Sequence, residues 1–481
     1  MKKALKSVPR VLFITGIMFV LIAGCTGNKD KDQPAYGEAL ATAPCLCETN
    51  WFPHSQTPAP EEGKGSPFDT ISTTNCIFQQ WAWQKFLWLT KAKSSARPLF
   101  LDSLKQVTHS MDTIEQRPGS SVVLSDIHQA GPDEVLSTNP AYNLIHAKSD
   151  TVYYSIHVNP ILQNAAARFR KGLKDGSISK INTKTFPIGS LELKLAWVAS
   201  RSIPSSSLPD FFTTQAVVMQ SDSTYVHTEV ALLGMHVVGV VINHPEFIWA
   251  TFEHKSMGPL FNWDSETVSA PGQTLLFAQG SASDIDGILW NQKVIPNVPF
   301  RAHQAFTLFQ YGTPRVKGDT FMKTSQENAA ENFNNIDGLN GCVTSGLTDV
   351  WKNYYYNGAI WINTDGLTAE QQADTLVKLK GKLHNASPGN IVRGSVNASN
   401  LTMETFQQTT QKKVTAINAE NLKNCFSCHI AEKDHSNISP LYLSHIFEGY
   451  VLLGQGKSHE EINAMRLGRF YERIKAMEEE H

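Results

Sequence analysis

The sequence predicts an α+β fold, with a predominantly antiparallel β domain in the centre of the chain and helical parts before and after it. Apolar residues alternate with other residues from about residue 186, first at Leu191–Trp197, and this period of two is typical of strands. Residues 75–90 contain no Gly or Pro, and residues 369–383 form an amphipathic pattern, so both stretches predict helices. With 481 residues, the chain is long enough for two or three domains.

Residues 1–24 resemble a bacterial lipoprotein signal peptide. Basic residues within the first ten positions precede an apolar run, Val11–Ala23, which is shorter than the about 20 residues that span a bilayer but suits a signal-peptide core. The run ends in Leu-Ile-Ala-Gly-Cys, so we expect cleavage before Cys25 and lipid attachment to that cysteine. The alternative is an uncleaved anchor. Either way, we expect the folded part in the cell envelope, on the periplasmic side of a membrane or at the cell surface.

Composition divides the remainder of the chain into four regions. Residues 25–74 are predicted to be a lipid tether followed by an irregular stretch, in which His54 is expected to be exposed. Residues 75–185 are predicted to be mixed α/β, residues 186–366 β-rich with Asn-Gly and Asp-Gly turns after residue 330, and residues 367–481 helical. The helix that opens the second region is apolar on nearly all sides, so we expect it to be buried, either as a core helix or with its aromatic side chains lining a ligand pocket.

Four cysteines remain when Cys25 and a pair near the C-terminus are set aside: Cys45, Cys47, Cys76 and Cys342. In an exported protein, an even number of cysteines predicts disulfides. Cys45 and Cys47 are too close in sequence to pair with each other, which leaves two pairings open. Cys45 can pair with Cys76 and Cys47 with Cys342, or Cys45 with Cys342 and Cys47 with Cys76. Either pairing would tie the N-terminal loop to the body of the protein, and free buried thiols are the alternative.

The strongest motif is Cys425-Phe-Ser-Cys428-His429. Cys-x-x-Cys-His is the attachment signature of c-type haem, in which both thiols bond to the porphyrin and the histidine is an axial ligand of the iron. One motif predicts one covalent haem c per chain. The alternatives are a disulfide, or half of a zinc site that His435 or His445 would complete. Haem attachment in bacteria takes place outside the cytoplasm, so the signal peptide favours the haem interpretation.

The motif leaves the second axial position of the iron open. His445 lies in the apolar stretch Leu441–Phe447, which is suited to cover a porphyrin face, and it is our tentative sixth ligand. His435 is a weaker candidate because it lies in a polar loop. Water, Met465 and a residue of the β domain are further candidates, as is an iron with no sixth ligand. Because few residues follow His429, we expect the haem c segment to pack on the β domain instead of forming a separate module.

Polar residues within apolar strands mark a second candidate site. His236, Glu253 and His254 are predicted to lie in the β domain, and buried imidazoles and carboxylates need hydrogen-bond partners. They could therefore be structural groups that bond to one another. They are also weak catalytic candidates, because a His–Glu pair can move the proton that O–O cleavage requires, and either His could contact a substrate or the iron.

Six stretches of the chain match motifs that occur together in one family. These stretches are Trp83-Gln84-Lys85-Phe86, Gly189–Lys194 with Ala196-Trp197, Gly234–Val238, Trp249–His254, Leu401–Thr405 and Leu443–Phe447. On these motifs the chain resembles an uncharacterised group of exported bacterial proteins with a C-terminal cytochrome c signature. The resemblance covers most of residues 75–450. It implies haem binding and points to electron transfer, but it gives no substrate.

Two classes of function follow from these predictions. The first is a cytochrome c-like lipoprotein that transfers electrons to or from a redox partner protein. The second is a haem-dependent oxidoreductase, peroxidase- or oxygenase-like, with the β domain as the site of a small-molecule substrate, so the sequence leaves open whether the protein is an enzyme. A weaker third class is a binding module with haem as a sensor. The net charge of −2, which falls further without the basic leader, argues against nucleic acid as a partner.

Overall fold

The computed structural model describes most of the chain from Cys45 onward. The described residues are 45–70, 73–93, 97–125, 136–219, 224–257, 329–362, 366–380 and 425–462, with short pieces between 261 and 308, between 392 and 410, and at 464–465. The chain divides into two units, Met1–Ala43 and Pro44–His481, and every described residue belongs to the second. The signal peptide, Cys25 and the tether lie outside the described residues. Within them, no helix has the length and apolar character needed to cross a membrane.

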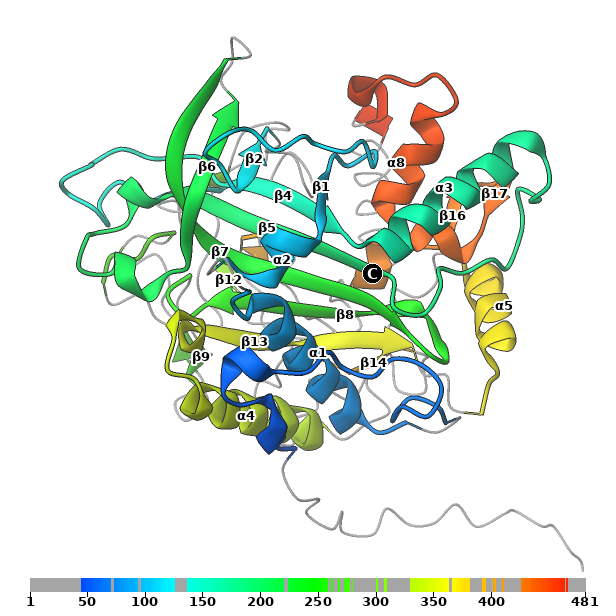
Figure 1. Ribbon diagram of the computed structural model, residues 1–481, viewed down its shortest axis with the longest axis horizontal. Coiled ribbons are helices and arrows are strands. Elements are labelled where there is room, and N and C mark those ends of the chain that lie inside the picture. Colours follow the sequence, from blue (N-terminus) through cyan, green and yellow to red (C-terminus); the bar gives the residue numbers. More distant parts are fainter. Residues whose placement is uncertain are drawn as a thin grey trace, which may run out of the picture. The chain divides into compact units, whose positions relative to one another are not determined.

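A nine-stranded sheet forms the centre of the second unit (Figure 1). Its main path runs β1-β4-β5-β7-β8-β13-β14, and β6 pairs with β7 and with β2. Every pairing is antiparallel except β2 with β6. The strands are β1 Lys105–Val107, β2 Val122–Leu124, β4 Tyr153–Val158, β5 Leu191–Ala199, β6 Thr213–Met219, β7 Tyr225–Val241, β8 His244–His254, β13 Tyr354–Ile362 and β14 Val392–Gly394. The predicted α+β class with an antiparallel sheet is confirmed, and strands from all three predicted regions after residue 74 share this one sheet.

Helices and short strands surround the sheet. The helices are α1 Asn75–Thr90, α2 Leu99–Ser103, α3 Pro160–Asp175, α4 Ala329–Gly346, α5 Ala369–Leu379, α7 Cys425–Cys428 and α8 His445–Leu453. Single 3-10 turns are η1 Thr49–Trp51, η2 His54–Gln56, η3 Ser200–Ser202, η4 Leu208–Asp210, η6 Val350–Asn353 and η9 Pro440–Leu443. The remaining short strands are β3 Leu136–Ser137, β9 Phe261–Asn262, β10 Thr267–Val268, β11 Phe300–Arg301, β12 Thr307–Leu308, β15 Thr409–Thr410, β16 Glu432–Asp434 and β17 Asn437–Ile438.

One face of the sheet, called the first face below, packs against α1. Alternate residues of each strand point to it, among them Leu193, Ala250 and Phe252. The ring of Phe86 on α1 stacks on Phe252 with centroids 4.1 Å apart. The prediction that α1 is buried is confirmed, and its aromatic side chains belong to a continuous core. Its one buried cation, Lys85, is paired with Glu62 at 2.7 Å.

The helix α4 lies where the sequence predicted turns. Its Asp337-Gly338 and Asn340-Gly341 pairs are typical turn residues, so the expectation of turns after residue 330 was wrong at these positions. Ile336, Leu339 and Val343 of α4 are buried in the core that contains α1. This burial outweighs the low helix propensity of Gly, which costs about 1 kcal/mol per residue relative to Ala.

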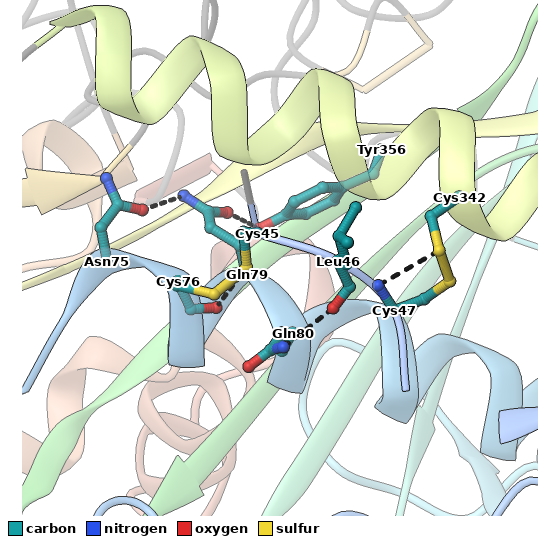
Figure 2. Close-up of a disulfide and its surroundings, with 9 residues drawn as sticks. All are labelled: Cys45, Leu46, Cys47, Asn75, Cys76, Gln79, Gln80, Cys342 and Tyr356. Carbon is teal, nitrogen blue, oxygen red and sulfur yellow. Dashed lines mark hydrogen bonds between the residues drawn. A yellow bond between two sulfur atoms is a disulfide. The ribbon is translucent and has the colours of Figure 1, made fainter. Parts of the chain in front are cut away.

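Two disulfides tie the N-terminal end of the described chain to this core (Figure 2). Cys45 is bonded to Cys76 of α1 and Cys47 to Cys342 of α4, with Cα atoms 5.5 and 5.8 Å apart. These distances lie within the usual range for disulfides. Of the two pairings that the sequence left open, the structure therefore shows the first, and the predicted tie between the N-terminal loop and the body of the protein is confirmed.

His54 also joins the N-terminal loop to the core. Its Nδ1 lies 2.5 Å from Oδ2 of Asp349, and its Nε2 lies 2.9 Å from the carbonyl oxygen of Leu87 in α1. Only 9% of the residue is exposed, so the expectation of an exposed His54 was wrong. The irregular stretch folds back onto α1, which a local sequence pattern does not reveal.

The opposite face of the sheet, called the second face below, packs against the C-terminal part of the chain. Val238, Trp249 and Ile360 are cross-strand neighbours on this face. They share one core with Leu162 of α3 and with apolar residues from the C-terminal segment. The C-terminal members of this core are Phe426, Ala431, Leu441, Tyr442, Leu443, Ile446, Phe447 and Val451.

Candidate haem site

The Cys-x-x-Cys-His motif forms a single helical turn. The backbone N–H of His429 donates to the carbonyl oxygen of Cys425 at 2.9 Å, which closes the turn of α7. Cys425 and Cys428 are half-buried and are not bonded to each other, whereas the other four described cysteines form disulfides. Both thiols and the imidazole therefore project from one short turn.

The imidazole of His429 is oriented by a backbone carbonyl. Its Nδ1 lies 2.7 Å from the carbonyl oxygen of Leu443. A carbonyl oxygen can only accept a hydrogen bond, so Nδ1 carries a proton, and in the neutral imidazole the ring lone pair lies on Nε2. Histidines that bind metals are usually fixed in this way, with the other ring nitrogen donating to a carbonyl or carboxylate.

Two aromatic rings contact the imidazole of His429. The ring of Trp249 on β8 lies 4.1 Å from it between centroids, at an interplanar angle of 42°. The ring of His445 stacks on it at 3.9 Å and 20°. Trp249 is itself held in place, because its indole N–H donates to the carbonyl oxygen of Glu246 at 3.0 Å. The motif therefore lies directly against the second face of the sheet.

His445, the tentative sixth ligand, stands at the start of α8 beside His429. Its Nε2 lies 3.1 Å from the carbonyl oxygen of Cys428. The preceding residue, Ser444, caps α8 by accepting from the N–H of Phe447 and also donates to the buried carboxylate of Glu192 at 3.0 Å. Two hydrogen bonds thus fix the start of α8, and with it the position of the His445 ring.

The side chains of the remaining C-terminal candidates, His435 and Met465, are exposed. The side chain of His435 is fully exposed and pairs with Glu432 at 3.1 Å. Met465 is 37% exposed. Among the residues that the structure describes, no group of three or more His, Cys, Asp and Glu side chains could hold a metal ion. A structural zinc site needs about four protein ligands, whereas a haem iron needs one or two because the porphyrin nitrogens supply the rest.

The three candidates in the β domain are divided between the two faces of the sheet. His236 pairs with Thr251 and Gly234 with Glu253, so His236 and Glu253 share the second face with Trp249. Glu253 is buried and accepts a hydrogen bond from the hydroxyl of Tyr355 at 3.0 Å. His236 is half-buried.

His254 points to the first face, away from the motif. Its ring stacks on Phe211 at 3.7 Å, and its Nε2 donates to the carbonyl oxygen of Asp210 at 3.1 Å. Burial lowers the pKa of His254 to about 4, so this imidazole is neutral at neutral pH. The structure therefore brings His236 and Glu253 to the side of the motif and gives His254 structural partners elsewhere.

Sequence reasoning missed the groups that orient the motif. Trp249 lies in one of the motifs on which the family resemblance rests, but that motif does not predict its contact with His429. Strand alternation does indicate that Trp249 shares a face of the sheet with the candidate residue Glu253, and this was the available signal in the sequence. The carbonyl of Leu443 and the carboxylate of Glu192 carried no comparable signal, since their roles depend on tertiary packing.

Comparison of the chain with protein-family models, with curated proteins and with solved structures gave no match. The resemblance to exported proteins with a cytochrome c signature stays a prediction.

Proposed function

We propose that the chain is an exported c-type haem protein that transfers electrons at the cell envelope. One haem would be bonded to Cys425 and Cys428, with His429 as an axial ligand of its iron. The main support for the proposal is the hydrogen bond that Nδ1 of His429 donates to the carbonyl oxygen of Leu443, at 2.7 Å. It leaves the metal-binding lone pair on Nε2 of the histidine that the attachment motif supplies.

The surrounding residues fit the needs of a redox centre. When bound, the haem supplies a one-electron iron couple whose potential depends on ligand basicity and on burial. The Leu443 carbonyl raises the basicity of His429 by accepting its N–H. Phe426, Leu441 and Tyr442, each at most 2% exposed, exclude water from the side of the motif. The contact between Trp249 and His429 supports packing of the haem c segment on the β domain.

Mass spectrometry of the chain made together with a haem-attachment system tests this proposal. We expect the mass of the protein plus one haem, and loss of that mass in the Cys425→Ala, Cys428→Ala double variant. His435→Ala, in the exposed loop, is the control and should keep the haem. An unmodified mass for the unaltered chain contradicts the proposal.

The proposed location is tested separately. A lipid at Cys25 would hold the protein at a membrane surface, where a redox partner protein would meet it. We expect Cys25→Ser to move the chain from the membrane fraction to the soluble fraction with its haem still attached. If Cys25→Ser stays with the membranes, the lipid anchor is wrong and the haem proposal is untouched.

A second candidate function is a haem-dependent oxidoreductase, peroxidase- or oxygenase-like, that uses the second face as a substrate site. The observation that favours it is that His236 and Glu253 share that face with Trp249, whose ring contacts His429. A histidine and a glutamate beside a bound haem would be able to move the proton that cleavage of an O–O bond requires. Peroxide turnover that is lost in His236→Ala and kept in His227→Ala, an exposed histidine of the same strand, would favour this function over electron transfer.

A further inference from the structure

We infer that His236 of β7 is the sixth ligand of the haem iron and that His445 is a positioning residue for His429. The inference rests on the proposed function, since it assigns the second face of the haem that Cys425 and Cys428 would hold. It rests on three observations: the direction of the His429 ring, the register of β7 and β8, and the stacking of His445.

The first observation is the direction of the His429 ring. Its Nδ1 is aimed at the Leu443 carbonyl, and the two nitrogens of an imidazole point to different sides of the ring. Glu192, Val238 and Trp249 are cross-strand neighbours and form one row of side chains on the second face. The hydrogen bond from Ser444 to Glu192 fixes the segment that carries Leu443 over this row. Nε2 therefore points away from the Leu443 carbonyl.

The second observation is the strand register. The next row on the second face contains Lys194, His236 and Thr251. On this row, Asn400 donates to the side chain of Thr251 at 3.3 Å, and it also donates to the carbonyl oxygen of Phe252 at 2.9 Å. The C-terminal region therefore contacts the row of His236 at Thr251, through Asn400, and the neighbouring row at Trp249, through His429.

The spacing between these rows suits a pair of axial imidazoles. Trp249 pairs with Val238, so His236 is its diagonal neighbour on the same face, at a distance of about 7–8 Å. An imidazole nitrogen lies about 2 Å from a metal that it binds, so two axial nitrogens lie about 4 Å apart and the ring centres roughly 6 Å apart. A ring in contact with Trp249 and a ring on His236 can therefore meet across one porphyrin plane.

The third observation concerns His445. Axial ligands meet end to end through the iron, with the porphyrin between them. His445 instead lies flat on His429, with centroids 3.9 Å apart and planes 20° from parallel, and its Nε2 is at the carbonyl of Cys428. This contact restricts rotation of the His429 ring, as Trp249 does from β8. His445 thus acts on the iron through His429.

The absorption and electron paramagnetic resonance spectra of the haem-loaded chain test the assignment. We expect low-spin, six-coordinate ferric iron in the unaltered protein and high-spin iron in His236→Ala, with low-spin iron restored when imidazole is added. His227→Ala is the matched control on the same strand and should keep the low-spin spectrum. A high-spin unaltered protein, or an unchanged spectrum in His236→Ala, overturns the assignment of His236.

Variants of His445 test whether this residue is a ligand of the iron or a positioning residue for His429. We expect His445→Phe, which keeps a stacking ring, to retain the low-spin spectrum and the resonance positions of the unaltered protein. His445→Ala should stay low-spin but shift those resonances, because the His429 ring can rotate. High-spin iron in both variants, or no shift in His445→Ala, contradicts the positioning role. Absence of haem from the unaltered chain is a failure of the proposed function, whereas haem with other spectra is a failure of this inference alone.

Discussion

The first face of the sheet is closed by aromatic side chains of α1 and by two disulfides, whereas the second face packs against the C-terminal segment that contains the Cys-x-x-Cys-His motif. On the first face the buried His157 and His254 are both held neutral, because burial lowers the pKa of His157 to about 3 and that of His254 to about 4. On the second face, the carboxylate of Glu192 accepts a hydrogen bond from Ser444, and the carboxylate of Glu253 accepts one from Tyr355. This difference fits our proposal, in which the first face stabilises the fold and the second face would lie beside the haem.

A large truncation on the first face is the strongest test of this division. Phe86→Ala removes a fully buried ring that stacks on Phe252, and such truncations cost about 3–5 kcal/mol. We expect a loss of that size in the free energy of unfolding, measured with denaturant, and an unchanged haem spectrum. A changed haem spectrum in a folded Phe86→Ala variant would show that the two faces are coupled.

Loss of a disulfide should weaken the same face. Removing a native disulfide costs about 2–5 kcal/mol, and in the chain-entropy account the cost rises with the length of the closed loop. The sequence separation is 295 for Cys47–Cys342 and 31 for Cys45–Cys76. We therefore expect the Cys47→Ala, Cys342→Ala double variant to be less stable than the Cys45→Ala, Cys76→Ala double variant. Thermal unfolding under non-reducing conditions measures the difference, and the reverse order would show that local strain decides instead.

Acid should destabilise the first face through His254. Its folded pKa of about 4 lies below the ordinary value of 6.5, so the unfolded chain binds its proton first. The contribution of this residue to the free energy of unfolding is therefore present above pH 6.5 and is lost as the pH falls from 6.5 to about 4. The total loss is about 3 kcal/mol. We expect His254→Gln to flatten the pH dependence of the unfolding free energy in this window. The exposed His227→Gln should leave the dependence as it is.

The smallest effect is expected on the second face. Ser444→Ala removes the cap of α8 and the partner of Glu192, and losses of this kind cost about 1–3 kcal/mol. Because His445 follows directly, we also expect a small shift of the haem resonances. Ser458→Ala removes an exposed cap and should produce no such shift. If the two variants give equal haem spectra, the capping of α8 has no effect on the haem.

Sequence patterns were sufficient for the features that depend on local order. Alternation in β5 predicted the sheet, the uninterrupted run from Asn75 predicted α1, and the motif at Cys425 is recognisable by itself. Alternation also implied that the adjacent Glu253 and His254 point to opposite faces, although the sequence alone did not say which face meets the motif.

Other features depend on contacts between distant parts of the chain. The pairing of Cys47 with Cys342, the burial of His54 and the helix through Gly338 and Gly341 all arise from packing against α1. The bond from His429 to the Leu443 carbonyl likewise requires the C-terminal segment to turn back on itself. Local propensity cannot reveal these features, because the free energy that decides them comes from residues far apart in sequence.

The two disulfides also determine how a mechanical load enters the protein. Cys45 and Cys47 are bonded to two different helices, α1 and α4, and both helices pack in the core of the first face. Tension applied to the chain before Cys45 therefore passes through covalent bonds into that core. The loop at Cys45 and Cys47 therefore cannot be pulled away from the body of the protein unless a disulfide breaks or one of these helices leaves the core.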